Sequence, residues 1–311
     1  MLENPKSPCR DVLLKDESFG NLLYDFLDTV IPMYKVRRIA EIGGGYGYLM
    51  RDFLRRDGML QAAMIDLSPF LLSQQRQTLA GYAVKFLQAD FLKLNMKDCI
   101  LSFIDLAILN EVIGDFPTAC DISRDSLIDA FQEGSLLSDP ILGEIVRIYG
   151  SYRISPPSSD LFAVNLGAIQ AIEKLCCARV PYIYVSEHSC EATVPEEWQG
   201  LMQIAPTGNP ERIRLHGHDE YSIRFSDLER VASTLGYTVK RGHYLDFIEP
   251  VIHGEVSFVL HLGSSRIARY EIIGQFIEDL VKYEYLILSL PQCEAVHAHQ
   301  CPLPLGRQKK V

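Results

Sequence analysis

The sequence of 311 residues lacks several features that would place it in a specialised class of protein. It has no apolar run near the ~18 residues that a membrane-spanning helix needs, so we expect no membrane segment. The first residues, MLENPKSPCRD, carry charges and no apolar core, so we expect no secretory signal. No internal repeat or low-complexity tract is present. Hydrophobic residues make up 48% and charged residues 23%, which indicates a folded globular protein and excludes disordered, collagen-like and coiled-coil classes.

Basic residues are scarce relative to acidic ones. The 30 lysines and arginines against 40 acids give a net charge of −10, which repels phosphate backbones, so we expect no nucleic-acid partner. The eight cysteines form no CxxC pair, and we expect reduced thiols and a cytoplasmic location. The tail has metal-capable atoms, but their spacing does not fit the usual zinc patterns, and we expect no metal site: Cys293, His297, His299, Cys301.

Strands and helices alternate along the first part of the chain. After an N-terminal helical segment, residues 1–36, the apolar pattern predicts four strands and two connecting helices. The strands are expected at 37–43, 61–68, 83–91 and 102–112, and the helices at 48–56 and 69–80. This rhythm predicts a parallel sheet with helices on both faces.

The rhythm breaks after the fourth expected strand. The next good strand is 181–188, and ordinary connections are far shorter than the intervening gap. Helical segments near 125–137, 141–149 and 160–178 fill it. We interpret 118–180 as a helical insertion that caps the sheet and forms the acceptor pocket, or else as packing structure that does not touch substrate.

In the last part of the chain, the sequence pattern predicts an edge of the sheet and a long helix. Strands at 237–248 and 256–263 are close enough to form an antiparallel hairpin. The main domain is therefore expected to span 37–263, followed by a C-terminal helix over 265–290 and a tail, together residues 264–311. The apolar face of this helix packs on the domain or forms a homodimer.

The strongest local signal is a glycine-rich turn. Glu41-Ile42-Gly43-Gly44-Gly45-Tyr46-Gly47 follows a strand and opens a helix, and glycines let a ligand approach the backbone closely. A dinucleotide-binding turn has the pattern G-x-G-x-x-G, but Tyr48 stands where its third glycine would be. The pattern that fits is E-x-G-x-G-x-G.

This pattern resembles motif I of the class I S-adenosylmethionine-dependent methyltransferases. The resemblance covers residues 37–115 well and 181–263 loosely. It implies a Rossmann-like fold, an α/β seven-stranded mostly parallel sheet with an antiparallel last strand, and S-adenosylmethionine as cofactor. It implies that the acid ending the second strand holds the ribose and that the acid ending the third holds the adenine amino group. The cofactor-binding residues implied are Glu41, Gly43, Gly44, Gly45, Gly47, Asp66, Leu67, Asp90, Phe91 and Asn110.

Polar residues at strand ends are the candidates for chemistry. Glu111 and Asp115 follow the fourth strand and could serve as a base, bind a cationic acceptor nitrogen, or cap a helix. His188 ends the fifth expected strand, a sensible place for a general base. His216 and His218 belong to a polar segment that either lines the acceptor site or forms a solvated loop.

The segment NEVIGDFP, residues 110–117, is similar to the N-E-x-x-D-x-x-P segment of the complex I assembly-factor type of protein arginine methyltransferase and its bacterial relatives. Gly114 stands where that family has its second acid, with Asp115 one place later. The sequence therefore favours a methyltransferase acting on a small organic molecule or a protein side chain. The alternatives are an arginine methyltransferase-like assembly factor, a non-catalytic cofactor-binding protein and a nicotinamide-dependent oxidoreductase, which the missing third glycine disfavours.

Overall fold

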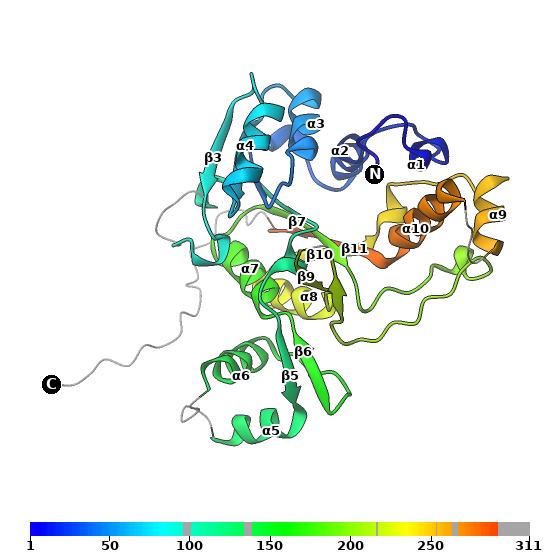
Figure 1. The fold of residues 1–311 in the computed structure, drawn as a ribbon. Helices are drawn as coiled ribbons and strands as arrows, with labels where there is room; N and C mark the ends of the chain where they lie inside the picture. Colours follow the sequence, from blue (N-terminus) through cyan, green and yellow to red (C-terminus); the bar gives the residue numbers. More distant parts are fainter. Residues whose placement is uncertain (96–100, 134–138, 216, 253, 263–266, 292–311) are drawn as a thin grey trace.

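The computed structural model describes residues 1–95, 101–133, 139–215, 217–252, 254–262 and 267–291 (Figure 1). Its centre is a seven-stranded sheet in the order β10-β11-β7-β4-β1-β2-β3. β11 alone runs antiparallel to its neighbours, β7 and β10, while the other pairs are parallel. This arrangement confirms the expected Rossmann-like sheet. Its strands are β1 (Arg38–Ile42), β2 (Gln61–Asp66), β3 (Val84–Gln88), β4 (Leu106–Asn110), β7 (Tyr182–His188), β10 (Thr238–His243) and β11 (Tyr283–Ser289).

Helices cover both faces of the sheet. Successive side chains of each strand point to opposite faces, so the sheet contributes to a core on each side. Ile39 of β1 belongs to one core and Ala40 to the other. The first core includes side chains of α2 (Phe19–Val30), α3 (Tyr48–Arg56), α4 (Pro69–Thr78) and α10 (Ala268–Lys282). The second includes side chains of α6 (Pro140–Tyr152), α7 (Leu166–Cys177) and α8 (Phe225–Thr234).

The start of α4 shows how local sequence sets these elements. The Ser68 side chain accepts a hydrogen bond from the Leu71 backbone N–H, and Pro69 occupies the first helical position, where no N–H is needed. α4 therefore begins directly after Asp66 and Leu67, which leaves both residues at the carboxyl end of the sheet.

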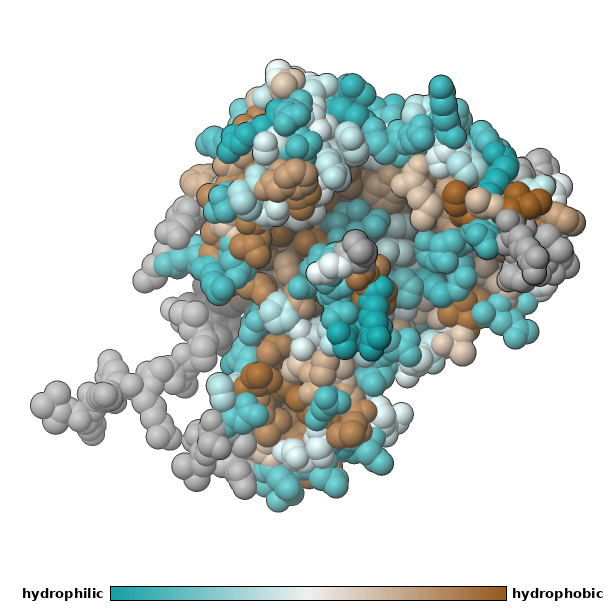
Figure 2. Space-filling model, in the orientation of Figure 1, coloured by the Kyte–Doolittle hydropathy of each residue, from teal (hydrophilic) through white to brown (hydrophobic). Residues whose placement is uncertain are grey.

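The insertion after β4 is smaller and less helical than expected. It contains a two-stranded ribbon, β5 (Ala119–Ser123) and β6 (Leu161–Val164), around α5 (Arg124–Glu133) and α6. The expected helix 160–178 is wrong in its first part, which forms β6, and α7 packs on the sheet. Figure 1 shows α5 and α6 at the lower end of the molecule, and Figure 2 shows hydrophobic residues on this part. Ile128 and Phe131 of α5 are among those exposed.

The expected C-terminal elements are confirmed only in part: β10 lies within the first expected strand and α10 within the expected long helix, but the second strand of the hairpin is wrong. Residues 255–262 form helix α9 (Glu255–Leu262), and the segment expected to be a single helix divides into α10 and β11. The strand that pairs with β10 is β11, so the sheet takes its antiparallel strand from beyond residue 263. The apolar face of α10 is buried within this chain, including Ile273 and Ile277 at 0% exposure.

Shorter elements complete the described structure. They are α1 (Pro8–Asp11), β8 (Arg212–Arg214) and β9 (Asp219–Tyr221), and the 3-10 helices η1 (Met33–Lys35), η2 (Phe91–Lys93), η4 (Leu101–Phe103), η5 (Ile113–Asp115), η7 (Glu196–Trp198) and η8 (Tyr244–Asp246). Within the residues described, none of the helices has the length and apolar character needed to cross a membrane.

Candidate functional site

The glycine turn joins β1 to α3 at the carboxyl end of the sheet. Gly43, Gly45 and Gly47 have φ angles of +68°, +50° and +81°, in the left-handed region that favours glycine. A Cβ on Gly43 would lie 2.2 Å from Cγ2 of Val112, so the turn packs tightly against the end of β4 there. A Cβ on Gly45 would meet nothing within 4 Å. The turn is therefore tightly packed at Gly43, whereas the space beside Gly45 is open.

Glu41 lies buried under this turn. Its Oε2 would be 2.9 Å from a Cβ on Gly44, and it has no hydrogen-bond partner among the described residues. Burial, assisted by the nearby charge of Asp66, raises the pKa of Glu41 to about 8. A buried oxygen without a partner is costly, so this carboxyl group fits a ligand that brings a hydrogen-bond donor.

Asp66 ends β2 and is held by two donors. Its Oδ1 accepts from the Ser68 backbone N–H at 2.8 Å, and its Oδ2 accepts from Nε2 of Gln75 at 2.9 Å. Gln75 is fully buried and also donates to the Gly45 carbonyl oxygen at 3.0 Å. It therefore connects the glycine turn to Asp66. Sequence reasoning missed Gln75, whose place in α4 gives no local signal. Leu67, the next residue after the acid, is 68% exposed.

Asp90 and Phe91 follow β3 at the start of η2. Asp90 accepts from the Leu92 backbone N–H and pairs with Lys93, whose Nζ lies 2.8 Å away and whose hydrogen bond lowers the pKa of Asp90. Phe91 is buried, and its ring stacks on that of Phe116 at 6.4 Å between centroids. Asp90 is thus a helix cap with a surface ion pair, and Phe91 is part of the core beneath it.

The carboxyl end of β4 carries Asn110 and Glu111 next to β7 and η8. Oδ1 of Asn110 accepts from the Ser186 hydroxyl at 3.0 Å, and the Tyr244 hydroxyl lies 3.3 Å from both Asn110 Oδ1 and Glu111 Oε1. Glu111 has a φ of +51°, an uncommon conformation for a residue other than glycine. The backbone there turns sharply and carries the Glu111 side chain toward a cavity.

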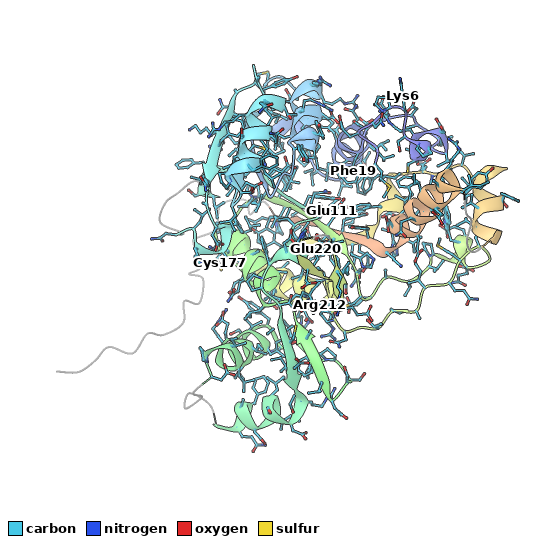
Figure 3. The ribbon with its side chains drawn as sticks, in the orientation of Figure 1. Lys6, Phe19, Glu111, Cys177, Arg212 and Glu220 are labelled. Carbon is cyan, nitrogen blue, oxygen red and sulfur yellow. The ribbon has the colours of Figure 1, made fainter. Side chains whose placement is uncertain are left out.

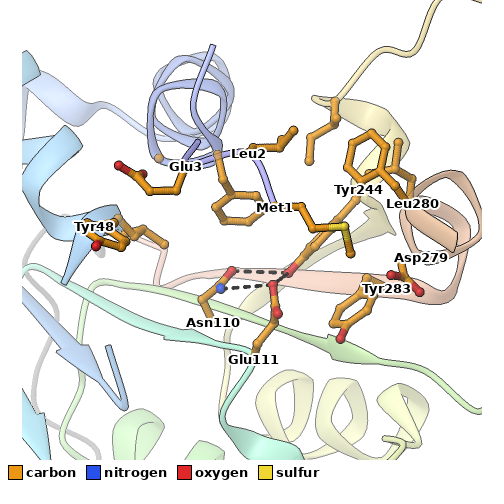
Figure 4. A pocket seen from close by; sticks show the side chains of 15 residues that line it. Met1, Leu2, Glu3, Tyr48, Asn110, Glu111, Tyr244, Asp279, Leu280 and Tyr283 are labelled. Carbon is orange, nitrogen blue, oxygen red and sulfur yellow. Dashed lines mark hydrogen bonds between the residues drawn. The ribbon is translucent and has the colours of Figure 1, made fainter. Parts of the chain in front are cut away.

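That cavity has a volume of about 270 Å³ and lies between the N-terminal segment, the start of α3, the end of β4, η8, α10 and the start of β11 (Figure 4). Tyr48 and Leu49, directly after the glycine turn, line it together with Asn110 and Glu111. Its described lining contains no residue of the insertion expected at 118–180, so the insertion does not form this cavity. The residues that sequence reasoning missed include Phe19, Tyr244, Asp279 and Tyr283.

Glu111 is exposed to solvent through the cavity, and protein atoms crowd around its carboxyl group. Burial raises the pKa of Glu111, and the charge of Asp279 raises it further. Burial also raises the pKa of Asp279. A positively charged or hydrogen-bond-donating group that enters the cavity would stabilise the charged form of both carboxyl groups.

Asp115 lies outside this cavity, in a cluster with the β8–β9 hairpin. Nε2 of His218 is 3.1 Å from Oδ1 of Asp115 and 3.2 Å from Oε1 of Glu220. Figure 3 shows Glu220 apart from Glu111, toward Arg212. The ligand atoms of this triad lie within 4.8 Å of one another, which is close enough to hold a metal ion. His216 lies outside the described residues, as does the Cys/His tail.

His188 also lies outside the cavity. Burial, assisted by the charge of Lys282, lowers its pKa to about 4, so its imidazole is neutral at pH 7 and a weak base. Neighbouring Glu187 is buried and accepts from the Gly114 backbone N–H at 3.1 Å. A Cβ on Gly114 would lie 3.1 Å from Oε2 of Glu187 and 3.0 Å from the Tyr221 carbonyl oxygen. An acid at this position would crowd both of these oxygen atoms.

Comparisons with known proteins give matches only at the level of structure. No protein family description matches this sequence, and no curated protein matches it. Solved structures with a similar fold include an S-adenosylmethionine-dependent methyltransferase from Mesorhizobium loti, which is 11% identical with a TM-score of 0.46, over 86% of this chain and 97% of that one. The methyltransferase domain of bacterial CtHen1-C is 13% identical with a TM-score of 0.42, over 87% and 98%.

A third similar structure is the N-terminal domain of EvdMO1 with SAH bound, at 12% identity and a TM-score of 0.43, over 72% of this chain and 74% of that one. Sequence identities of this size indicate a similar fold at most and say nothing about the substrate. Independently of them, the sheet has the arrangement that the glycine motif implies: an Asp at the end of β2 faces the turn after β1, and the last strand is antiparallel. The described sheet therefore has the Rossmann-like arrangement that the resemblance of the glycine motif implies.

Proposed function

We propose that this protein binds S-adenosylmethionine and transfers its methyl group to an acceptor, either a small organic molecule or a protein side chain. The observation that carries the proposal is the junction of the glycine turn with the cavity beside Glu111. The turn ends at Gly47, and Tyr48 and Leu49, which follow at once, are part of the cavity wall. A cofactor on the turn would thus have its reactive end next to an enclosed acceptor space.

The proposed cofactor contacts follow from local geometry. The open backbone at Gly45 allows close approach, and the unpartnered oxygen of Glu41 suits a donor group. Asp66 would bind the ribose hydroxyls, since Gln75 and Ser68 already fix the orientation of its carboxylate. Leu67 is exposed where it could cover the adenine. The other residues of the proposed set rest on the motif resemblance alone: Gly43, Gly44, Gly47, Asp90, Phe91 and Asn110.

The sulfonium group of the cofactor is already activated for methyl transfer, so the chain has mainly to position the two reactants. Glu111 is the acceptor-side residue that we favour, because it alone of the three sequence candidates lines the cavity. Asp115 and His188 would then act indirectly or not at all. None of the five described cysteines forms a disulfide, which accords with a reducing cytoplasm. A homodimer would need a surface other than the buried face of α10.

The proposal is tested by calorimetric titration with S-adenosylmethionine, S-adenosylhomocysteine and NAD. We expect saturable binding of the first two and a loss of both in Asp66→Ala, while Asp125→Ala, an exposed substitution in α5, binds normally. Binding of NAD alone would favour an oxidoreductase and overturn the assignment. Cofactor binding without methyl transfer to any acceptor would favour a non-catalytic binding protein, and labelling of protein arginine would favour the assembly-factor type.

A further inference from the structure

The cavity beside Glu111 has an unusual balance of charge. Glu111 enters it from the end of β4 and Asp279 from α10, and the charge of Asp279 raises the pKa of Glu111. Glu3 also lines the cavity but pairs with Arg51. The described residues that line it include no lysine or arginine. The nearby Lys282 pairs with Glu278 and lines a different cavity, but its charge lowers the pKa of Asp279. Met1 also lines the cavity, and its terminal ammonium group lowers the pKa of Glu111. Carboxylates nevertheless outnumber cations in the described lining, which favours a ligand that carries positive charge.

Aromatic rings form another part of the cavity wall. Tyr244 and Tyr283 stack with their centroids 5.1 Å apart and their planes at 22°, and Phe19 meets Tyr244 at 5.3 Å. Figure 4 shows Tyr244 and Tyr283 between Glu111 and Asp279. Aromatic rings attract cations through their π electrons, and cages of such rings hold ammonium ligands. Rings and carboxylates therefore point to the same ligand charge.

The size of the cavity limits what can enter. Its volume of about 270 Å³ is at the lower end of ligand pockets, so it admits a compact group and not a large planar substrate. We propose that the methyl acceptor is an amine whose nitrogen enters this cavity as a compact cation, between Glu111 and Asp279 and against Tyr244 and Tyr283. This inference rests on the proposed methyltransferase function and names its substrate class.

The proposed reaction transfers one proton and one methyl group. The ammonium group gives one proton to the Glu111 carboxylate and becomes a neutral amine with a free electron pair. That pair forms the new C–N bond to the methyl group while the C–S bond breaks and its electrons stay on sulfur, which leaves a thioether. The product is a methylammonium ion, and Glu111 releases its proton to water. The elevated pKa of Glu111 makes it a better acceptor for this proton than an ordinary carboxylate.

The test compares two probes that differ in charge and little in shape. Choline and 3,3-dimethylbutan-1-ol are titrated into protein saturated with S-adenosylhomocysteine. We expect choline to bind at least ~10-fold more tightly than the neutral alcohol. Glu111→Gln and Asp279→Asn should each remove most of that preference. Glu278→Gln, one residue earlier on α10 and outside this cavity, should keep it.

Each other outcome has a distinct meaning. Equal affinity for the two probes, or a preference that survives both acid substitutions, overturns the inference. Binding of choline to the ligand-free protein but not to the protein saturated with S-adenosylhomocysteine would show that the cavity belongs to the cofactor, which also overturns the inference. Failure to bind S-adenosylhomocysteine in the first place refutes the proposed function instead. A turnover assay with labelled cofactor adds a second criterion: methyl transfer to phenols or carboxylates but not to alkylamines is incompatible with an amine acceptor.

Discussion

The contrast between Gly43 and Gly45 allows a quantitative prediction within a single turn. Both residues have a positive φ, so alanine at either position adopts a left-handed conformation that costs about 1–2 kcal/mol. At Gly45 the new methyl group enters open space, and this is the whole cost expected for folding. At Gly43 the methyl group also meets Val112 at 2.2 Å, and relief of such overpacking costs about 1–3 kcal/mol more.

We therefore expect Gly43→Ala to lower the free energy of unfolding by about 2–5 kcal/mol and Gly45→Ala by about 1–2 kcal/mol. Urea denaturation of the two variants measures the difference directly. Adding Val112→Ala to Gly43→Ala should recover part of the loss, so the two substitutions should be non-additive. Gly43→Ala that is no less stable than Gly45→Ala would refute the packing argument.

The same pair separates stability from binding. If the cofactor approaches the open backbone at Gly45, its alanine variant should bind S-adenosylhomocysteine at least ~10-fold more weakly, although it is the more stable of the two. Calorimetry on the folded variants gives this affinity. Unchanged binding by Gly45→Ala would mean that the ligand does not approach the turn at that residue.

Two further predictions concern the groups around the turn. Gln75→Leu removes a donor to Asp66 and should weaken S-adenosylhomocysteine binding about 10-fold by calorimetry, whereas Gln77→Leu, exposed on the same helix, should bind as the parent protein does. The pKa of Glu41, about 8 in the folded chain against 4.5 in the unfolded one, means that the unfolded state loses this proton first as pH rises. Stability should fall by up to about 1.4 kcal/mol per pH unit between pH 5 and 8, and Glu41→Gln should flatten that slope in urea denaturation; an unchanged slope would contradict the assignment.

The first half of the sheet was predictable because its signals are local. β1, the glycine turn and α3 follow one another within residues 38–56, and each has its own pattern of apolar residues or glycines. The C-terminal part was not predictable in this way. Tyr283–Ser289 is a short, nearly continuous apolar run, which periodicity cannot assign to a strand or a buried helix. Its partner β7 lies far earlier in the chain. Pairing with β7 therefore makes this segment a strand, and no local sequence pattern indicates it.

The same division holds at the candidate site. Glu111 was found because it follows a strand at a position where this fold places reacting groups. Asp279 lies on a helix that the sequence predicted and Tyr283 on a strand that it missed, and nothing near either residue in the chain resembles a motif. Asp115 and His188 had the right residue type at a strand end, yet the turn at Glu111 directs the chain away from the cavity before Asp115 is reached.

The position of β11 has a consequence for how the chain is assembled during synthesis. Residues 189–282 separate β11 from β7, and β10 has no partner in the described sheet except β11. Until residues 283–289 have emerged from the ribosome, β7 is an open edge with unpaired backbone groups, of the kind that recruits foreign strands. Closing so long a loop is also slow relative to local pairing. During synthesis, the unpaired edge of β7 is therefore the part of the sheet that needs protection from aggregation for the longest time.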